Sequence, residues 1–187
     1  MFILAKHLKE QGELKDNMVV STVMSNIGFY KAIEENGLQS IKTAVGDRYV
    51  VEEMRKNDYS LGGEQSGHIV LMNYATTGDG ILTAVKLANI IKTSGKSLEE
   101  LASEVNIYPQ KLVNIKVVDK KTAMEDSDIL AECEKVEKEL EGNGRILLRA
   151  SGTENLIRVM VEASSDELTD KYCEQVAKIV REKFEVK

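Results

Sequence analysis

The sequence has few of the residues that mark an unusual environment, with two cysteines, one proline, two histidines and no tryptophan in 187 residues. Cys133 and Cys173 lie in helix-like segments, without CxxC spacing and without a histidine nearby, so we predict reduced core thiols and neither a disulfide nor a metal site. A basic half or stripe is also lacking, because the net charge is −6 and the acidic excess is shared evenly along the chain. This pattern argues against a nucleic-acid partner.

Long apolar runs are absent too, so no segment approaches the length needed to cross a bilayer and no membrane partner is expected. Residues 1–12 contain a short apolar run with neither a preceding basic stretch nor a cleavage signal, which excludes a secretion signal. We therefore expect a soluble protein in the reducing cytoplasm. The helix pattern at 2–8 has no cap or leading loop, which suggests part of a longer protein. No Walker loop, HExxH motif, Ser-His-Asp order or metal-spaced carboxylate cluster is present, so no metal ligand is assigned.

What is present is enough apolar sequence, 42% of the residues, for one or two globular cores. The first part alternates strands and helices, which predicts a mixed βαβ domain of the α/β class over residues 1–108. A capping box at Ser97 and Glu100 starts its last short helix. The expected elements are strands at 18–25 and 40–45 and helices at 26–37, 46–58, 81–95 and 98–105.

After Pro109 the order of elements changes, and the domain boundary is expected near 106–112. Residues 109–187 predict an α+β domain, a small antiparallel sheet covered by two helices. Ser164, with Glu167 three residues on, is the expected cap of the last helix. The expected elements are strands at 111–119, 145–150 and 156–163 and helices at 127–141 and from about 165.

The stretch RASGTENLIRV places Arg149 at the end of one strand, a polar turn at 151–153, and Arg158 inside the next strand. Such a turn can aim backbone N–H groups and hydroxyls at one point, while flanking guanidinium groups supply paired donors, and a phosphate dianion needs such donors. A plain polar hairpin with two surface arginines is an equal alternative. Glu154 opposes anion binding unless it points away.

The stretch GGEQSGH offers a carboxylate, an amide, a hydroxyl and an imidazole at Glu64, Gln65, Ser66 and His68. Side chains of this kind suit the recognition of sugar hydroxyls, because a wrong epimer leaves a hydrogen bond unpaired. The alternative is a glycine-rich connection, with His68 simply hydrogen-bonded at the start of a strand. In VGDRYV, Asp47 is most simply a helix cap, and TTGDG (76–80) is most simply a turn and cap.

The combination of GGEQSGH with RASGTENLIRV resembles the α-D-phosphohexomutases, and within them the bacterial phosphoglucosamine mutase subfamily. MSNIGFY, VGDRYV and TTGDGI resemble the same subfamily, so the resemblance covers nearly the whole chain. It implies the third and fourth domains of a four-domain enzyme that interconverts glucosamine 6-phosphate and glucosamine 1-phosphate for cell-wall precursor synthesis. A phosphoserine and a glucosamine 1,6-bisphosphate intermediate carry that reaction, and Mg²⁺ is bound by aspartates.

The resemblance carries substrate contacts over to Glu64, Gln65, Ser66 and His68, with a proton-transfer role for His68 and an active-site turn at Arg48. It implies a phosphate-binding loop with the members Arg149, Ser151, Gly152, Thr153, Asn155 and Arg158. Asn155 departs from the proline of many members, which would loosen the turn by under about 1 kcal/mol without removing a donor.

Neither the serine loop nor the aspartate loop of the missing N-terminal domains occurs in this sequence, so the chain alone is expected to bind sugar phosphate weakly without turnover. A phosphomannomutase or phosphoglucomutase fragment is an alternative, against which Gln65 argues. A non-catalytic sugar-phosphate-binding module and a structural or dimerising module are the others, and a homodimer is compatible with the sequence.

Overall fold

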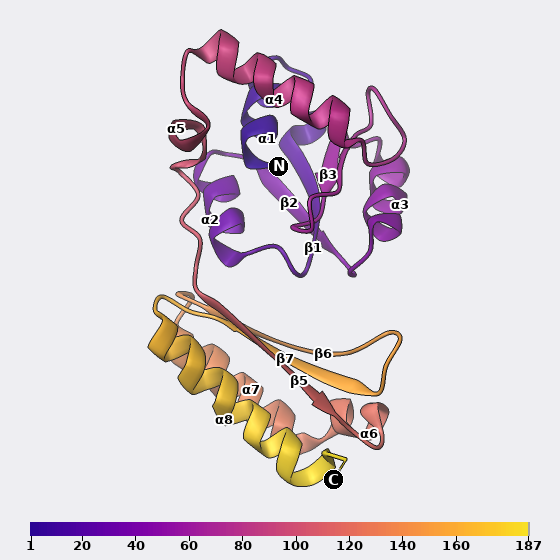
Figure 1. Ribbon diagram of the computed structural model, residues 1–187, viewed down its shortest axis with the longest axis vertical. Helices are drawn as coiled ribbons and strands as arrows, with labels where there is room; N and C mark the ends of the chain where they lie inside the picture. Colours follow the sequence, from indigo (N-terminus) through magenta and orange to yellow (C-terminus); the bar gives the residue numbers. More distant parts are fainter. Residues whose placement is uncertain (187) are drawn as a thin grey trace. The chain divides into compact units, whose positions relative to one another are not determined.

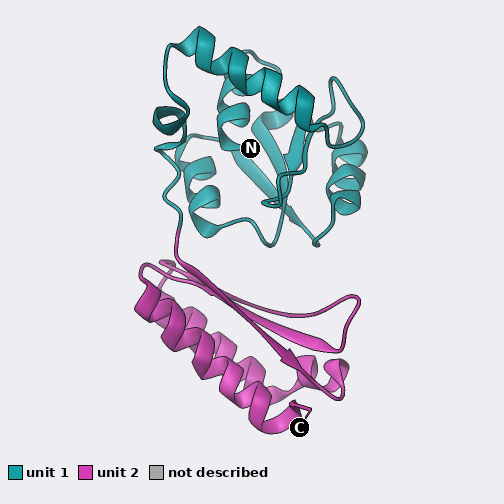
Figure 2. Ribbon diagram, in the orientation of Figure 1, with its two compact units in different colours: residues 1–107 teal, residues 108–187 magenta. Residues whose placement is uncertain are grey.

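The computed structural model describes residues 1–186, which form two compact units, residues 1–107 and residues from 108 onward (Figure 2). Each unit has its own sheet, the first with two hydrophobic clusters and the second with one among the described residues. Within the described residues, no helix combines the length and the apolar character needed to span a membrane.

The first unit is a layered α/β domain (Figure 1). Its sheet has the order β2-β1-β3-β4, in which the first three strands are parallel and β4 runs antiparallel to β3. The mixed α/β arrangement predicted from the sequence is confirmed. Its elements are α1 (Phe2–Glu10), a 3₁₀ turn (Lys15–Asn17), β1 (Met18–Thr22), α2 (Ile27–Glu35), β2 (Gln39–Thr43), α3 (Asp47–Asn57), β3 (Leu61–Gly63), β4 (Ile69–Leu71), α4 (Gly80–Ser94) and α5 (Leu98–Ala102).

Alternating residues of the buried strand β1 serve two separate cores. Val19 joins the cluster formed with α1, α2 and α4, whereas Val20 joins Val50 and Met54 of α3. Helices therefore cover both faces of the sheet, as parallel strands require. This layering leaves the carboxyl ends of β1, β2 and β3 at one edge, where open α/β sheets bind their ligands.

Two expectations for this unit need correction. The strand expected at 18–25 ends at Thr22, because the chain turns there and the Ser25 N–H donates to the Thr22 carbonyl at 3.0 Å. Asp47 is not the cap of α3, since the N-cap is Gly46 and the Asp47 carboxylate accepts from the Arg48 N–H at 2.8 Å. The capping box of Ser97 and Glu100 is confirmed.

The second unit is the predicted small antiparallel sheet, in the order β5-β7-β6, with α7 and α8 on one face (Figure 1). Its core gathers every second residue of the strands, such as Ile157 and Val159, against the helices. Ser165, not Ser164, caps the last helix, accepting from the Leu168 N–H at 3.3 Å. The elements are β5 (Gln110–Lys116), α6 (Lys120–Glu125), α7 (Ser127–Leu140), β6 (Arg145–Ala150), β7 (Leu156–Glu162) and α8 (Asp166–Phe184).

Both cysteines are free thiols, with Cys133 half-buried on α7 and Cys173 buried on α8. Burial raises the pKa of each thiol to about 11. Because the thiolate is the nucleophile, only about a thousandth of each thiol is reactive at pH 8. We expect a thiol reagent such as Ellman's reagent to label the native chain far more slowly than the chain in denaturant. Equal labelling rates in the two conditions would contradict this burial.

Candidate functional site

In the first unit, the stretch Glu64–His68 forms the tight loop that joins β3 to β4. The Glu64 N–H donates to the His68 carbonyl at 2.9 Å, and the Gly67 N–H donates to the Glu64 carbonyl at 3.1 Å. Gly67 has a φ of +100°, a conformation that glycine adopts without a Cβ clash. The Ser66 hydroxyl lies 3.3 Å from His68 Nδ1. The backbone therefore holds the four polar side chains of the motif on one short turn.

Glu64 also connects this loop to the start of α3. Its Oε1 accepts the Gly46 N–H at 2.9 Å, a contact between residues 18 positions apart. A carboxylate has about four lone-pair sites, so one hydrogen bond leaves capacity for a ligand hydroxyl or ammonium group. Glu64 is only half-buried, so part of the residue is accessible from solvent. Sequence reasoning missed the role of Gly46. Nothing in VGDRYV indicates that its backbone N–H has a hydrogen-bond partner in the loop that follows β3.

The loop TTGDG lies against the same hairpin. Asp79 caps α4 by accepting the Leu82 N–H at 2.9 Å, and its own N–H lies 3.3 Å from the Ile69 carbonyl. A Cβ built on Gly78 would lie 3.7 Å from the His68 side chain, so this glycine packs directly beside the imidazole. The turn-and-cap interpretation of TTGDG is confirmed, and the loop adds a wall next to His68.

Arg48 lies in the first turn of α3, and its side chain is largely exposed. Its Nε is 3.4 Å from Glu52, and its guanidinium lies over the Tyr49 ring at 4.9 Å. The Gly46–Glu64 hydrogen bond brings this turn to the hairpin loop, but the Arg48 side chain is engaged along its own helix. Its expected role in an active-site turn stays a prediction.

In the second unit, Arg149 and Arg158 are directly opposite each other on the antiparallel strands β6 and β7. Their neighbours Leu148 and Val159 pack into the core under the helices, so both arginines face the other side of the sheet. Burial and the adjacent Arg158 charge lower the pKa of the Arg149 guanidinium. Among residues 1–186, neither arginine forms an ion pair, and each has a buried Nε without a hydrogen-bond partner.

Like charges directly opposite on a sheet destabilise the pair, and buried donors are normally hydrogen-bonded. Arg145, four residues before Arg149 on β6, has the usual partner of a buried guanidinium, because its Nε donates to the Glu162 carboxylate at 2.7 Å. The Arg149–Arg158 pair lacks such a carboxylate. An anion with several oxygens would satisfy both guanidinium groups at once.

The loop between these strands, residues 151–155, is fixed at both ends. The Ser151 N–H donates to the Leu156 carbonyl at 2.9 Å, and the Ser151 hydroxyl accepts the Glu154 N–H at 3.3 Å. The Asn155 carbonyl accepts the Val117 N–H at 3.0 Å. Ser151 is buried, whereas Gly152, Thr153 and Asn155 are exposed. The loop is thus an ordered turn with an accessible tip.

Glu154 does not neutralise the arginine pair. In the part of the chain that the structure describes, no ion pair joins its carboxylate to Arg149 or Arg158. Glu154 instead lines a separate groove with Val118 and Val186, which neither arginine lines. The objection to an anion site raised by this carboxylate therefore loses its force.

One residue of this site was missed entirely by sequence reasoning. Lys120, the first residue of α6, donates from Nζ to the Ser151 carbonyl at 2.8 Å and to the Glu154 carbonyl at 3.4 Å. It lies 31 residues before Ser151, within a stretch that carries no recognisable motif. Only the packing of α6 against the sheet reveals its connection to the loop.

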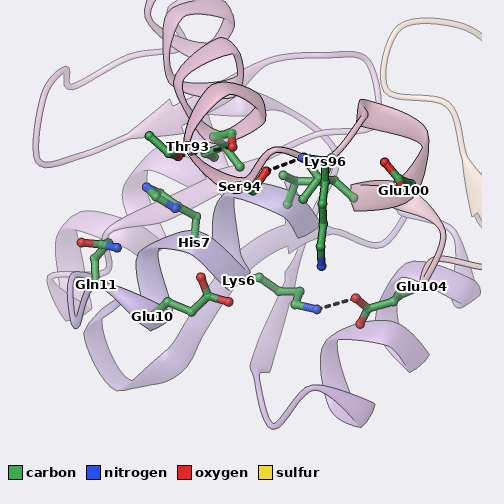
Figure 3. A pocket seen from close by; sticks show the side chains of 12 residues that line it. Lys6, His7, Glu10, Gln11, Thr93, Ser94, Lys96, Glu100 and Glu104 are labelled. Atoms are coloured by element: carbon green, nitrogen blue, oxygen red, sulfur yellow. Dashed lines mark hydrogen bonds and ion pairs between the residues drawn. The ribbon is translucent and has the colours of Figure 1, made fainter.

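A pocket of about 360 Å³ between α1, α5 and the C-terminal end of α4 is a distinct feature (Figure 3). It lies at the opposite end of α4 from the TTGDG loop, roughly 20 Å away for a helix of this length. Lys6 and Glu104 on its rim pair with each other (Figure 3). Glu100 is held in the capping box with Ser97. We assign no ligand to this pocket.

Two family models match the chain, and together they span most of it. They are "Phosphoglucomutase/phosphomannomutase, alpha/beta/alpha domain III" over residues 1–108 and "Phosphoglucomutase/phosphomannomutase, C-terminal domain" over residues 112–179. The chain belongs to the phosphoglucomutase/phosphomannomutase family. The hairpin loop falls within the domain III match, and the arginine pair falls within the C-terminal-domain match.

Relatives within this family have phosphoglucosamine mutase names. The phosphoglucosamine mutase of Anoxybacillus flavithermus is 60% identical over 184 residues, which cover 98% of this chain and 41% of that protein. The phosphoglucosamine mutase of Leuconostoc mesenteroides is 62% identical over 183 residues, covering 98% and 40%. The chain therefore spans about 41% of the length of the curated relatives it matches.

A solved structure has the same fold. The crystal structure of Aspergillus fumigatus N-acetylphosphoglucosamine mutase in complex with GlcNAc-6P and magnesium matches with a TM-score of 0.78 at 20% identity. The match covers 96% of this chain and 42% of the fungal one. At this identity the likeness is one of fold.

Proposed function

We propose that this chain supplies substrate binding to a phosphoglucosamine mutase, which interconverts glucosamine 6-phosphate and glucosamine 1-phosphate in the bacterial cytoplasm. The single observation that carries the proposal is the Arg149–Arg158 pair, two facing guanidinium groups with unpartnered Nε atoms beside an exposed polar turn. The phosphoglucosamine mutase names of relatives at about 60% identity support the choice of sugar.

In this proposal the loop 151–155 and its two arginines hold the phosphate group that is not being transferred. Guanidinium forks suit this task, because they hydrogen-bond phosphate oxygens in pairs and remain charged at any physiological pH. A binding loop built of such general donors accepts a phosphate on either end of the sugar. The loop needs that tolerance if a glucosamine 1,6-bisphosphate intermediate reorients between two half-reactions, since it then binds each phosphate group in turn.

The loop Glu64–His68 would recognise the sugar itself. The second oxygen of Glu64 can accept from a hydroxyl or from the 2-ammonium group that distinguishes glucosamine from mannose and glucose. Gln65 and Ser66 add a neutral amide and a hydroxyl on the same turn. His68, whose Nδ1 lies 3.3 Å from the Ser66 hydroxyl, would move a proton at a reacting oxygen.

The Mg²⁺ implied for the parent enzyme does not fit this chain. Among residues 1–186, no group of three or more His, Cys, Asp or Glu side chains is arranged to hold a metal ion. We therefore assign the metal ligands and the phosphorylated serine to the part of the relatives that this chain does not span. The same part would be the partner of these two units in a complete enzyme.

The test is an NMR titration of the ¹⁵N-labelled chain with glucosamine 6-phosphate, mannose 6-phosphate and inorganic phosphate. We expect the amides of 151–155 to shift with all three ligands and those of 64–68 to shift mainly with the amino sugar. Replacing Glu64 with glutamine should weaken glucosamine 6-phosphate binding by about tenfold, since a charge-assisted hydrogen bond is lost. Its binding of inorganic phosphate should be unchanged.

Glu35→Gln is the matched control, because it removes the same charge from an exposed position at the end of α2. An equal response of 64–68 to mannose 6-phosphate would favour a phosphomannomutase or phosphoglucomutase parent. No response of either loop at millimolar ligand would refute binding by this chain.

A further inference from the structure

Lys120 connects α6 to the two ends of the phosphate loop, through its hydrogen bonds to the Ser151 and Glu154 carbonyls. We propose that Lys120 is a positioning residue, which orients the peptide groups of the loop so that their N–H groups face the bound phosphate. This inference rests on the proposed phosphate-binding function of the loop. It assigns the lysine no direct contact with substrate.

The argument begins with the geometry of a peptide group. All peptide bonds of the described chain are trans, so the C=O of one residue and the N–H of the next point in opposite directions. Lys120 draws the carbonyl oxygens of Ser151 and Glu154 toward itself. The N–H groups of Gly152 and Asn155, which belong to the same two peptide groups, therefore point away from the lysine.

Those two N–H groups are free to serve a ligand. Within residues 1–186, neither the Gly152 N–H nor the Asn155 N–H donates to another group of the chain. Two other N–H groups of this turn are used internally, because Ser151 donates to Leu156 and Glu154 donates to the Ser151 hydroxyl. Within residues 1–186 the Thr153 N–H has no acceptor either, but its peptide group is not held by Lys120. The turn thus uses two donors in its own structure and leaves three available, two of which are oriented by Lys120.

The side chain of Lys120 extends from a helix start that is held by an N-cap. Asp119 caps α6 with Oδ1 accepting the Lys121 N–H at 2.9 Å and Oδ2 accepting the Thr122 hydroxyl at 2.5 Å. The Lys120 side chain is half-buried, whereas Lys121 beside it is exposed. A lysine with two carbonyl acceptors and a capped helix beneath it holds its partners in place, unlike a free surface charge.

The experiment compares Lys120→Met with Lys121→Met in the full 187-residue chain, by ¹⁵N NMR titration with inorganic phosphate. Lys120→Met should weaken phosphate binding about tenfold, because the loop must then order its peptide groups when the phosphate binds. Lys121→Met removes the same charge one residue away and should change the affinity by less than about twofold. Equal affinities of the two variants would overturn the proposal.

Raising the salt concentration separates orientation from charge. A long-range charge effect is screened at high salt, so the difference between the variants should then vanish if charge alone is responsible. We expect the difference to persist, since the orientation of the peptide groups does not depend on salt. Disappearance of the difference in high salt would overturn the proposal.

A measurement without ligand tests the loop independently of phosphate binding. The heteronuclear NOE values of the amides at 152–155 should fall in Lys120→Met and stay unchanged in Lys121→Met. Unchanged values in both variants would overturn the positioning role even if phosphate binds. If the unmodified chain fails to bind phosphate, the proposed function fails, whereas the ligand-free values still decide whether Lys120 holds the loop.

Discussion

Replacing Arg149 with methionine is expected to remove measurable phosphate binding while leaving the chain at least as stable as before. Each guanidinium supplies paired, charge-assisted hydrogen bonds to phosphate, so the dissociation constant should rise by about a hundredfold. The free chain loses a like-charge pair and an unpartnered buried Nε, both of which oppose folding. Phosphate titration by NMR and thermal unfolding by calorimetry measure the two effects.

Arg145→Met is the matched control on the same strand. Arg145 donates to Glu162, which is fully buried, and its own side chain is 13% exposed. Removing this partner of a buried carboxylate should lower the free energy of unfolding by about 3–5 kcal/mol. A similar loss of stability in Arg149→Met would show that Arg149 serves the fold and would contradict its assignment to ligand binding.

Gly63→Ala is expected to destabilise the first unit and to disable its loop. A Cβ at this position would lie 2.5 Å from the His68 carbonyl oxygen and 3.2 Å from the Ile69 Cα, both of them backbone atoms. The strands β3 and β4 must separate to admit it, at about 1–3 kcal/mol. The His68 carbonyl accepts the Glu64 N–H, the hydrogen bond that closes the loop. Displacing this carbonyl therefore weakens that hydrogen bond.

The measurements are calorimetric unfolding and the glucosamine 6-phosphate titration, in which the shifts at 64–68 should be lost and those at 151–155 kept. Gly80→Ala is the control, because a Cβ there meets no atom within 4 Å in the first turn of α4. It should stabilise the chain by up to about 1 kcal/mol. A Gly63→Ala chain with the stability and the ligand shifts of the control would refute the close packing of β3 and β4.

Most strands and helices of both units were predictable because they carry a clear hydrophobic pattern, whereas α6 and the short strand β3 were not expected. The alternation in RILLRA and LIRVMVE predicts strands, and the two flanking arginines lie where that pattern places them. The other errors fall at the ends of elements. Ser164 and Ser165 are both good caps, and only the position of the first helical turn of α8 decides between them. Likewise β1 ends at Thr22 because of a turn that its β-branched run does not indicate.

The parts of the site that sequence reasoning missed are contacts made through space. Lys120 reaches Ser151 across 31 residues, and the Gly46 N–H reaches Glu64 across 18. Neither residue differs in type or spacing from an ordinary helix start. Motifs identify side chains that are close in sequence, whereas the supports of a loop come from whichever element packs beside it.

Each binding loop is supported within its own unit. The hydrogen bonds described for residues 64–68 join them to one another and to Gly46. Those described for residues 151–155 join them to one another, to Val117, to β7 and to Lys120. If the loops divide the substrate as proposed, natural selection can alter them one at a time. A lineage could acquire a new sugar preference through substitutions in the five-residue loop 64–68, while its phosphate-binding loop stays unchanged.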